Sequence, residues 1–187
     1  MADPIATYQT RVSGLWTTTH RLTGPEGEVG ALTVHRNRWG MIDRGEWSPN
    51  KGEVLHFRRD PGILRSQFSL WTVGREWLGS SLRSSFLRRE IVLHTGSRPL
   101  RMLPLSGLRT GWTIQAPRTG ELARLTGGVI GRSMEIEVFR KLEFELVVFA
   151  YFLGWQIRHE AFWPGPLLDE DPSLGTPAKP PASPAPK

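Results

Sequence analysis

Seven arginines in one short stretch, residues 75–109, are the side chains of this sequence most suited to binding chemistry. The stretch holds only two acidic residues, so its net charge is +5 (seven arginines minus Glu76 and Glu90). Guanidinium groups form paired hydrogen bonds with phosphate and carboxylate groups, so arginines that face one way make a surface for anions. We expect Trp77 and Phe86 to be apolar or stacking partners on this surface. The predicted anion-binding residues are Arg83, Arg88, Arg89, Arg98 and Arg101.

The arginine content of the whole chain allows a second interpretation. Arginine outnumbers lysine by 20 to 4 among the 187 residues, and the arginines are spread along the sequence. A GC-rich coding genome produces the same excess without any function. Arginines on the outside of a β-protein are also commonly solvated and joined in scattered ion pairs. The sequence alone therefore leaves both an anion-binding surface and a compositional bias open.

Catalytic and metal-binding motifs are not recognisable in the sequence. The five histidines never fall two within five residues, so they lack the spacing of a zinc-binding helix. Residues 126–133 depart from a phosphate-binding loop, because Thr126 replaces its first glycine and Arg132 replaces its lysine. We therefore expect no metal and no cofactor, and we favour a protein without enzymatic activity. An enzyme would need histidines and carboxylates that converge only in the folded chain.

Composition sets the broad class of the protein. Cysteine is absent, which excludes disulfides, thiolate metal sites and cysteine nucleophiles. The hydrophobic content of 39% and the charged fraction of 22% are typical of a globular protein, and 187 residues fit one domain better than two. The first ten residues lack the charged start and apolar stretch of a signal peptide, so we expect a cytoplasmic protein.

Short apolar runs separated by turn residues predict a mostly β protein. In the turn at residues 59–62, Pro61 presets the backbone and Gly62 permits the positive dihedral angle that such turns require. Strands at this close spacing predict an antiparallel sandwich or barrel. The expected hairpins are residues 32–42, 54–71 and 112–125, and the expected single strands are residues 75–82, 90–94 and 134–139.

A different pattern appears near the end of the chain, where residues 146–155 are apolar on every side of a helical wheel. A helix without a polar face must be enclosed by protein or by lipid. Ten helical residues span about 15 Å, which is half of the roughly 30 Å thickness of a bilayer core, so we expect no transmembrane span. We predict a helix over about residues 142–158, whose early Glu143 and Glu145 suit its positive N-terminus. A buried strand is the alternative, because valine and aromatic residues favour sheets.

The expected domain organisation is one barrel with flexible ends. Residues 1–14 are polar and expected to be flexible, and residues 15–165 form the barrel domain with its helix. Residues 166–187 consist mostly of proline, alanine, serine and lysine, so we expect this tail to be disordered. Residues 181–184 have the PxxP spacing of a peptide ligand, although that spacing arises freely in such a tail.

The order of these elements resembles that of the tubby C-terminal-like group, which includes LURP-one-related proteins and phospholipid scramblases. Successive hairpins, the strand at residues 134–139 and the apolar C-terminal helix carry the resemblance, which covers residues 15–159. The resemblance implies a closed barrel of about twelve strands wrapped around a central helix. It also implies a non-catalytic binding protein, often one at membrane surfaces. It transfers no ligand-binding residue of that group to a position in this sequence.

These features predict a cytoplasmic binding or scaffold module without enzymatic activity. Its expected fold is mainly β, an antiparallel barrel built of hairpins around a buried C-terminal apolar helix. The expected partner is an anionic membrane surface, which the arginine-rich surface meets from outside the bilayer. The alternative partner is a nucleic acid that binds the same surface through its phosphates.

Overall fold

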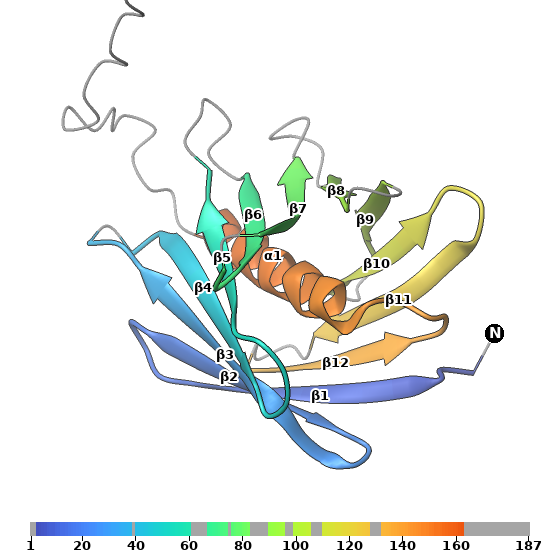
Figure 1. Ribbon diagram of the computed structural model, residues 1–187, viewed down its shortest axis with the longest axis horizontal. Helices are drawn as coiled ribbons and strands as arrows, with labels where there is room; N and C mark the ends of the chain where they lie inside the picture. Colours follow the sequence, from blue (N-terminus) through green and yellow to red (C-terminus); the bar gives the residue numbers. More distant parts are fainter. Residues whose placement is uncertain are drawn as a thin grey trace, which may run out of the picture.

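Twelve antiparallel strands follow one another around a closed barrel in the computed structural model of this chain (Figure 1). The structure describes residues 3–38, 40–60, 67–74, 76–82, 90–95, 99–105, 110–127 and 132–162, with side chains up to residue 156 in the last range. The strands are β1 (Ala6–Ser13), β2 (Thr18–Gly24), β3 (Gly27–Arg36), β4 (Ile42–Pro49), β5 (Leu55–Arg59), β6 (Phe68–Thr72), β7 (Trp77–Leu82), β8 (Ile91–His94), β9 (Leu100–Pro104), β10 (Gly111–Ala116), β11 (Gly120–Gly127) and β12 (Ser133–Val138). Each strand pairs with its neighbours in sequence, and β1 pairs with β12 to close the barrel.

Alternating side chains explain why these segments form the wall of a barrel. In β12, Met134, Ile136 and Val138 are buried, whereas Glu135 is exposed and Glu137 is half-buried. Successive side chains of a strand point to opposite faces, so one face of each strand lines the interior and the other meets solvent. The predicted fold class, a mainly β antiparallel barrel, is confirmed.

The predicted hairpins are present as the pairs β3–β4, β5–β6 and β10–β11. In the first, the Gly40 N–H donates to the Asn37 carbonyl at 2.9 Å, and the Met41 N–H donates to Asn37 Oδ1 at 3.0 Å. Gly40 has a φ of 77°, a conformation that glycine adopts without steric cost. The predicted strands at residues 75–82 and 90–94 correspond to β7 and β8.

The barrel begins earlier in the chain than the sequence predicts. Strand β1 lies within residues 1–14, for which we expected a flexible segment, and β2 and β9 match no predicted strand. In β1 only Thr10 is fully buried, so the strand lacks the apolar alternation by which strands are recognised. Pairing orders it instead, because β12 and β2 take up its backbone hydrogen bonds on either side and the barrel is left without an edge.

Helix α1 (Phe144–Phe162) runs through the interior of the barrel (Figure 1). Residues 146–156 are all buried and lie within this helix, so the predicted buried helix is confirmed and the alternative of a buried strand is wrong. The helix begins two residues later and ends four residues later than the predicted range of about 142–158. No helix within the described residues is both long and apolar enough to cross a membrane. The predicted disordered tail, residues 166–187, lies outside the described residues.

The up-and-down strand order divides the connections of the barrel between its two ends. The chain reverses at one end between β1 and β2, β3 and β4, β5 and β6, β7 and β8, β9 and β10, and β11 and β12. We call this the β1–β2 end. The remaining reversals lie at the opposite end, where the chain passes from β12 into α1. The helix therefore runs from the opposite end toward the β1–β2 end.

Aromatic side chains of α1 contact rings on strands of the first half of the barrel, from β1 to β6. The ring of Phe152 lies 5.0 Å from the rings of Phe57 on β5 and Phe68 on β6. On another side of the helix, the ring of Trp155 lies 4.6 Å from that of His20 on β2. Near the start of the helix, the Phe144 ring lies 4.9 Å from Tyr8 on β1. These contacts fix the rotation of the helix within the barrel.

Two glycines make room for this packing. A Cβ atom at Gly45 on β4 would lie 2.9 Å from atoms of both Phe152 and Phe57. A Cβ atom at Gly154 of α1 would lie 2.8 Å from the indole of Trp112 on β10. Both distances are shorter than the normal separation of about 3.5–4.0 Å between carbon atoms in contact. Glycine at these positions therefore lets the helix and the wall approach closely.

We predict that Val148→Asp unfolds the protein, because Val148 is fully buried in α1 and an unpaired buried charge costs about 3–5 kcal/mol. That loss is comparable to the whole stability of many domains. Val73→Asp is the matched control, because Val73 is 57% exposed and should accept the charge without unfolding. Circular dichroism and urea unfolding measure both variants. A folded Val148→Asp protein would show that α1 is peripheral to the core.

Candidate functional site

A small polar cluster joins α1 to the wall inside the barrel. The imidazole of His20 is fully buried, with Nδ1 2.7 Å from the Tyr151 hydroxyl and Nε2 3.0 Å from Thr18 Oγ1. Burial raises the pKa of the Tyr151 phenol well above its ordinary value, although a hydrogen bond with Thr10 opposes the rise. The phenol therefore stays neutral, and the cluster satisfies polar groups that would otherwise be buried at a cost.

The interior offers little room for chemistry around this cluster. The neighbours of His20 and Tyr151 are aromatic and aliphatic side chains of the core, and no metal-binding group of three suitable side chains occurs among the described residues. Further along α1, Gln156 is fully buried, and its amide has no hydrogen-bond partner within the described ranges. We interpret the His20 cluster as a structural link between β2 and α1.

The other histidines with described side chains do not converge on one site. His35 lies on β3, His56 on β5 and His94 on β8, so the three residues are on separate strands of the outer wall. His56 has an acidic neighbour, with Nδ1 3.9 Å from a carboxylate oxygen of Glu46 on β4. The fold therefore does not bring these three histidines together in one catalytic site.

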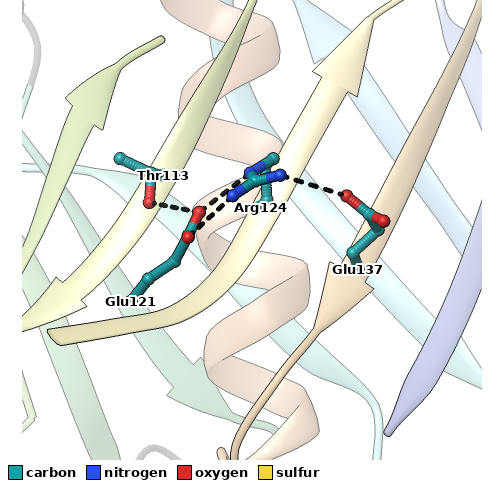
Figure 2. A network of polar contacts seen from close by, with 4 residues as sticks. All are labelled: Thr113, Glu121, Arg124 and Glu137. Atoms are coloured by element: carbon teal, nitrogen blue, oxygen red, sulfur yellow. Dashed lines mark hydrogen bonds and ion pairs between the residues drawn. The ribbon is translucent and has the colours of Figure 1, made fainter. Parts of the chain in front are cut away.

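A polar network crosses three strands on the outer wall (Figure 2). Arg124 on β11 makes a two-pronged ion pair with Glu121, with nitrogen–oxygen distances of 2.9 and 2.7 Å. Glu121 also accepts a hydrogen bond from Thr113 on β10, and Glu137 on β12 lies 3.9 Å from Arg124. The hydrogen bond with Glu121 is the main cause of the raised pKa of Arg124. This arginine joins β10, β11 and β12 and is not available to an external anion.

An open groove of about 730 Å³ lies over β1, β2 and β12. Its charges are balanced, because Arg11 and Arg21 face each other across β1 and β2 while Glu28 and Glu135 lie in the same groove. Arg21 also lies 3.9 Å from Glu28. The groove therefore has no net charge to attract an anion and no pairing of a nucleophile with a base. Its lining residues are Gln9, Thr10, Arg11, Arg21, Thr23, Glu28, Thr126, Gly127, Ser133, Met134 and Glu135.

Of the predicted anion-binding arginines, one lies within the described residues. Arg101 is on β9 with a side chain 62% exposed, and its Nε lies 3.6 Å from a carboxylate oxygen of Glu90. The predicted partner Trp77 begins β7 and is 43% exposed. Arg83, Arg88, Arg89 and Arg98 lie outside the described residues, as does Phe86.

The β1–β2 end has a feature that the sequence did not reveal. Leu15 and Trp16, between β1 and β2, are 85% and 55% exposed, although their apolar character predicts burial. The described residues around them, 12–19, 35–38, 40–43 and 132–133, contain three arginines and one acidic residue, the exposed Asp43. These arginines are the half-buried Arg36, which donates to the Gly40 carbonyl, and the exposed Arg38 and Arg132. Only the fold brings these apolar and cationic residues to one end.

A second group of cationic and aromatic residues lies on the outer wall. Arg44 on β4 is opposite Arg58 on β5, and Trp71 on β6 is opposite Trp77 on β7. Both arginines are exposed, and Trp71 is half-buried. Like charges directly opposite each other across two strands are destabilising, and Glu46, two residues after Arg44 on the same face of β4, supplies an opposite charge beside this pair.

We predict that the stability of the protein falls above about pH 10 and that Tyr151→Phe reduces this fall. Unfolded Tyr151 ionises near its ordinary pKa of about 10, whereas the folded protein holds it protonated, so rising pH favours the unfolded chain. The slope from this one group is about 1.4 kcal/mol per pH unit. Urea unfolding of both proteins between about pH 8 and pH 11 measures it. Equal slopes in both proteins would contradict the burial of a neutral phenol.

Comparisons with known proteins complete the description of the site. No protein-family model, no curated protein and no solved structure matches this chain. The architecture therefore rests on the strand pairing and the buried helix, and the resemblance to the tubby C-terminal-like group stays a prediction from the order of elements.

Proposed function

We propose that this protein is a non-enzymatic binding module that docks on anionic membrane surfaces through its β1–β2 end. The observation that carries the proposal is the pairing of exposed apolar residues with an excess of arginines over acidic residues in the described residues around the β1–β2 turn. The filled interior supports it as well, because α1 occupies the space in which a barrel of this kind would hold a ligand. Binding is therefore expected on the outside.

Electrostatics supports an anionic surface as the partner. A basic residue close to an anionic leaflet contributes about 1 kcal/mol to binding. Arg38 and Arg132 supply such charges at the β1–β2 end. In this proposal Arg101 contributes little, because Glu90 lies beside it.

The resemblance predicted from the order of elements points the same way. A twelve-stranded barrel around a C-terminal helix is the arrangement that the resemblance to the tubby C-terminal-like group implies, and that resemblance favours non-catalytic binding at membrane surfaces. The resemblance supplies no ligand-binding residue, so the residues in the proposal come from this chain alone.

Vesicle co-sedimentation with the full chain tests the proposal. We expect binding to vesicles of phosphatidylcholine and phosphatidylserine that weakens as salt is added, and much weaker binding to phosphatidylcholine alone. Arg38→Glu with Arg132→Glu should lower the affinity by about 30-fold or more, since two favourable charges are lost. Arg118→Glu is the matched control, because Arg118 is exposed in the β10–β11 turn at the opposite end. Negligible binding to both kinds of vesicle at low salt would refute the proposal.

A nucleic acid is the second candidate partner, and the outer wall of β4–β7 is the feature that favours it. Arg58 and Trp71 are on neighbouring strands two residues out of register, so the cationic pair and the tryptophan pair are adjacent on one face. Single-stranded nucleic acids bind surfaces where aromatic rings stack with bases beside cations that contact phosphates.

Oligonucleotide binding separates this candidate from the membrane proposal. We expect Trp77→Ala and Arg58→Glu each to weaken binding of single-stranded DNA or RNA by about tenfold, while vesicle binding is unchanged. Fluorescence anisotropy at several salt concentrations measures the affinity and its salt slope. Absent or salt-insensitive oligonucleotide binding would remove the candidate.

A further inference from the structure

We infer that Leu15 and Trp16 form a wedge that inserts into the interfacial layer of an anionic bilayer when the β1–β2 end docks. This inference rests on the proposed function and adds the residues that enter the lipid. Five large apolar residues of the described chain are exposed, and only Leu15 and Trp16 are consecutive. Their exposed fractions of 85% and 55% leave two apolar side chains in water at the tip of a hairpin.

The backbone of the β1–β2 turn holds the two side chains in this position. Gly14 has a φ of 89°, and a Cβ atom there would collide with the carbonyl oxygen of Thr17. The turn is closed by pairing between Ser13 and Thr19, whose carbonyl accepts a hydrogen bond from Ser13 Oγ at 3.3 Å. Glycine is therefore required at position 14, and the tip presents the next two residues without a rearrangement of the strands.

Charges on both sides of the turn favour a lipid surface over a protein partner. On one side, the Val12 N–H donates to the Arg132 carbonyl at 2.9 Å, which places exposed Arg132 beside the end of β1. On the other side, Thr18 pairs with Val34, so the β3–β4 turn with Arg38 lies next to the tip. A projecting apolar tip between cations matches an anionic interface, where tryptophan is enriched and arginine meets the head groups.

This geometry also defines an orientation on the membrane. The helix runs toward the β1–β2 end, so insertion of the tip would set the barrel axis at a steep angle to the bilayer, with the opposite end in water. Val73, which is 57% exposed between β6 and β7, would then be distant from the lipid. Leu15 and Val73 lie at opposite ends of the barrel, but both are apolar and exposed.

The absence of cysteine makes the test direct, because Leu15→Cys and Val73→Cys each create a unique thiol for an environment-sensitive dye. We expect a blue shift at position 15 on adding phosphatidylcholine–phosphatidylserine vesicles, together with quenching by lipids that carry a quencher near the interface. The dye at position 73 should show neither effect. A dye at position 15 that stays water-like while the protein sediments with the vesicles would overturn the wedge.

A second variant separates the wedge from the proposed function. Leu15→Ser with Trp16→Ser should lower vesicle affinity by about tenfold or more while the salt dependence remains, because apolar contact is lost and the charges are kept. Both residues are exposed, so an unchanged melting temperature is expected and checks the fold. Unchanged affinity in this variant, with loss of binding in Arg38→Glu/Arg132→Glu, would overturn the wedge and leave the membrane proposal standing. A wild-type protein that binds no vesicles would overturn both.

Discussion

The whole architecture depends on burying a helix that has no polar face. Residues 146–156 are buried on every side, so α1 needs a complete apolar wall around it, and a closed barrel provides one. The glycines at positions 45 and 154 show how closely helix and wall approach. The same helix fills the interior and leaves there a small polar cluster around His20. The outer wall and the ends of the barrel are therefore the surfaces left for binding, whereas some barrels enclose a ligand in their interior.

The sequence predicts the parts of this fold whose apolar pattern is periodic. Alternation in residues 134–139 identifies β12, and the unbroken apolar run identifies α1. Strand β1 escapes prediction because a polar strand is ordered by its two neighbours, one of which is more than a hundred residues away. The candidate site escapes for a similar reason. The exposure of Trp16 follows from its place in the turn between β1 and β2, and its position near Arg38 and Arg132 follows from the pairing of β1 with β12 and of β2 with β3. Neither is encoded in a local sequence pattern.

The outer wall and the β1–β2 end differ in how many acidic residues lie near their arginines. On the wall, Arg124, Arg101 and Arg21 each have a glutamate nearby on the same or a neighbouring strand. Such pairs add little stability when exposed, but they cancel the local field. Around the β1–β2 turn the described residues include Arg36, Arg38 and Arg132 and one acidic residue, Asp43. Positive charge therefore exceeds negative charge in the described residues around this turn.

The closure of the barrel by β1 and β12 also bears on how the chain reaches its folded state. Ala6 pairs with Val138, so the first strand has no partner on one side until almost the whole barrel sequence has been synthesised. The helix that fills the core follows still later. Contacts of such long sequence separation slow folding, because a large loop must close before they form. Before α1 is synthesised, the apolar inner faces of the earlier hairpins have no helix to pack against. Exposed apolar faces make a nascent chain prone to aggregation, so folding depends on rapid completion of α1.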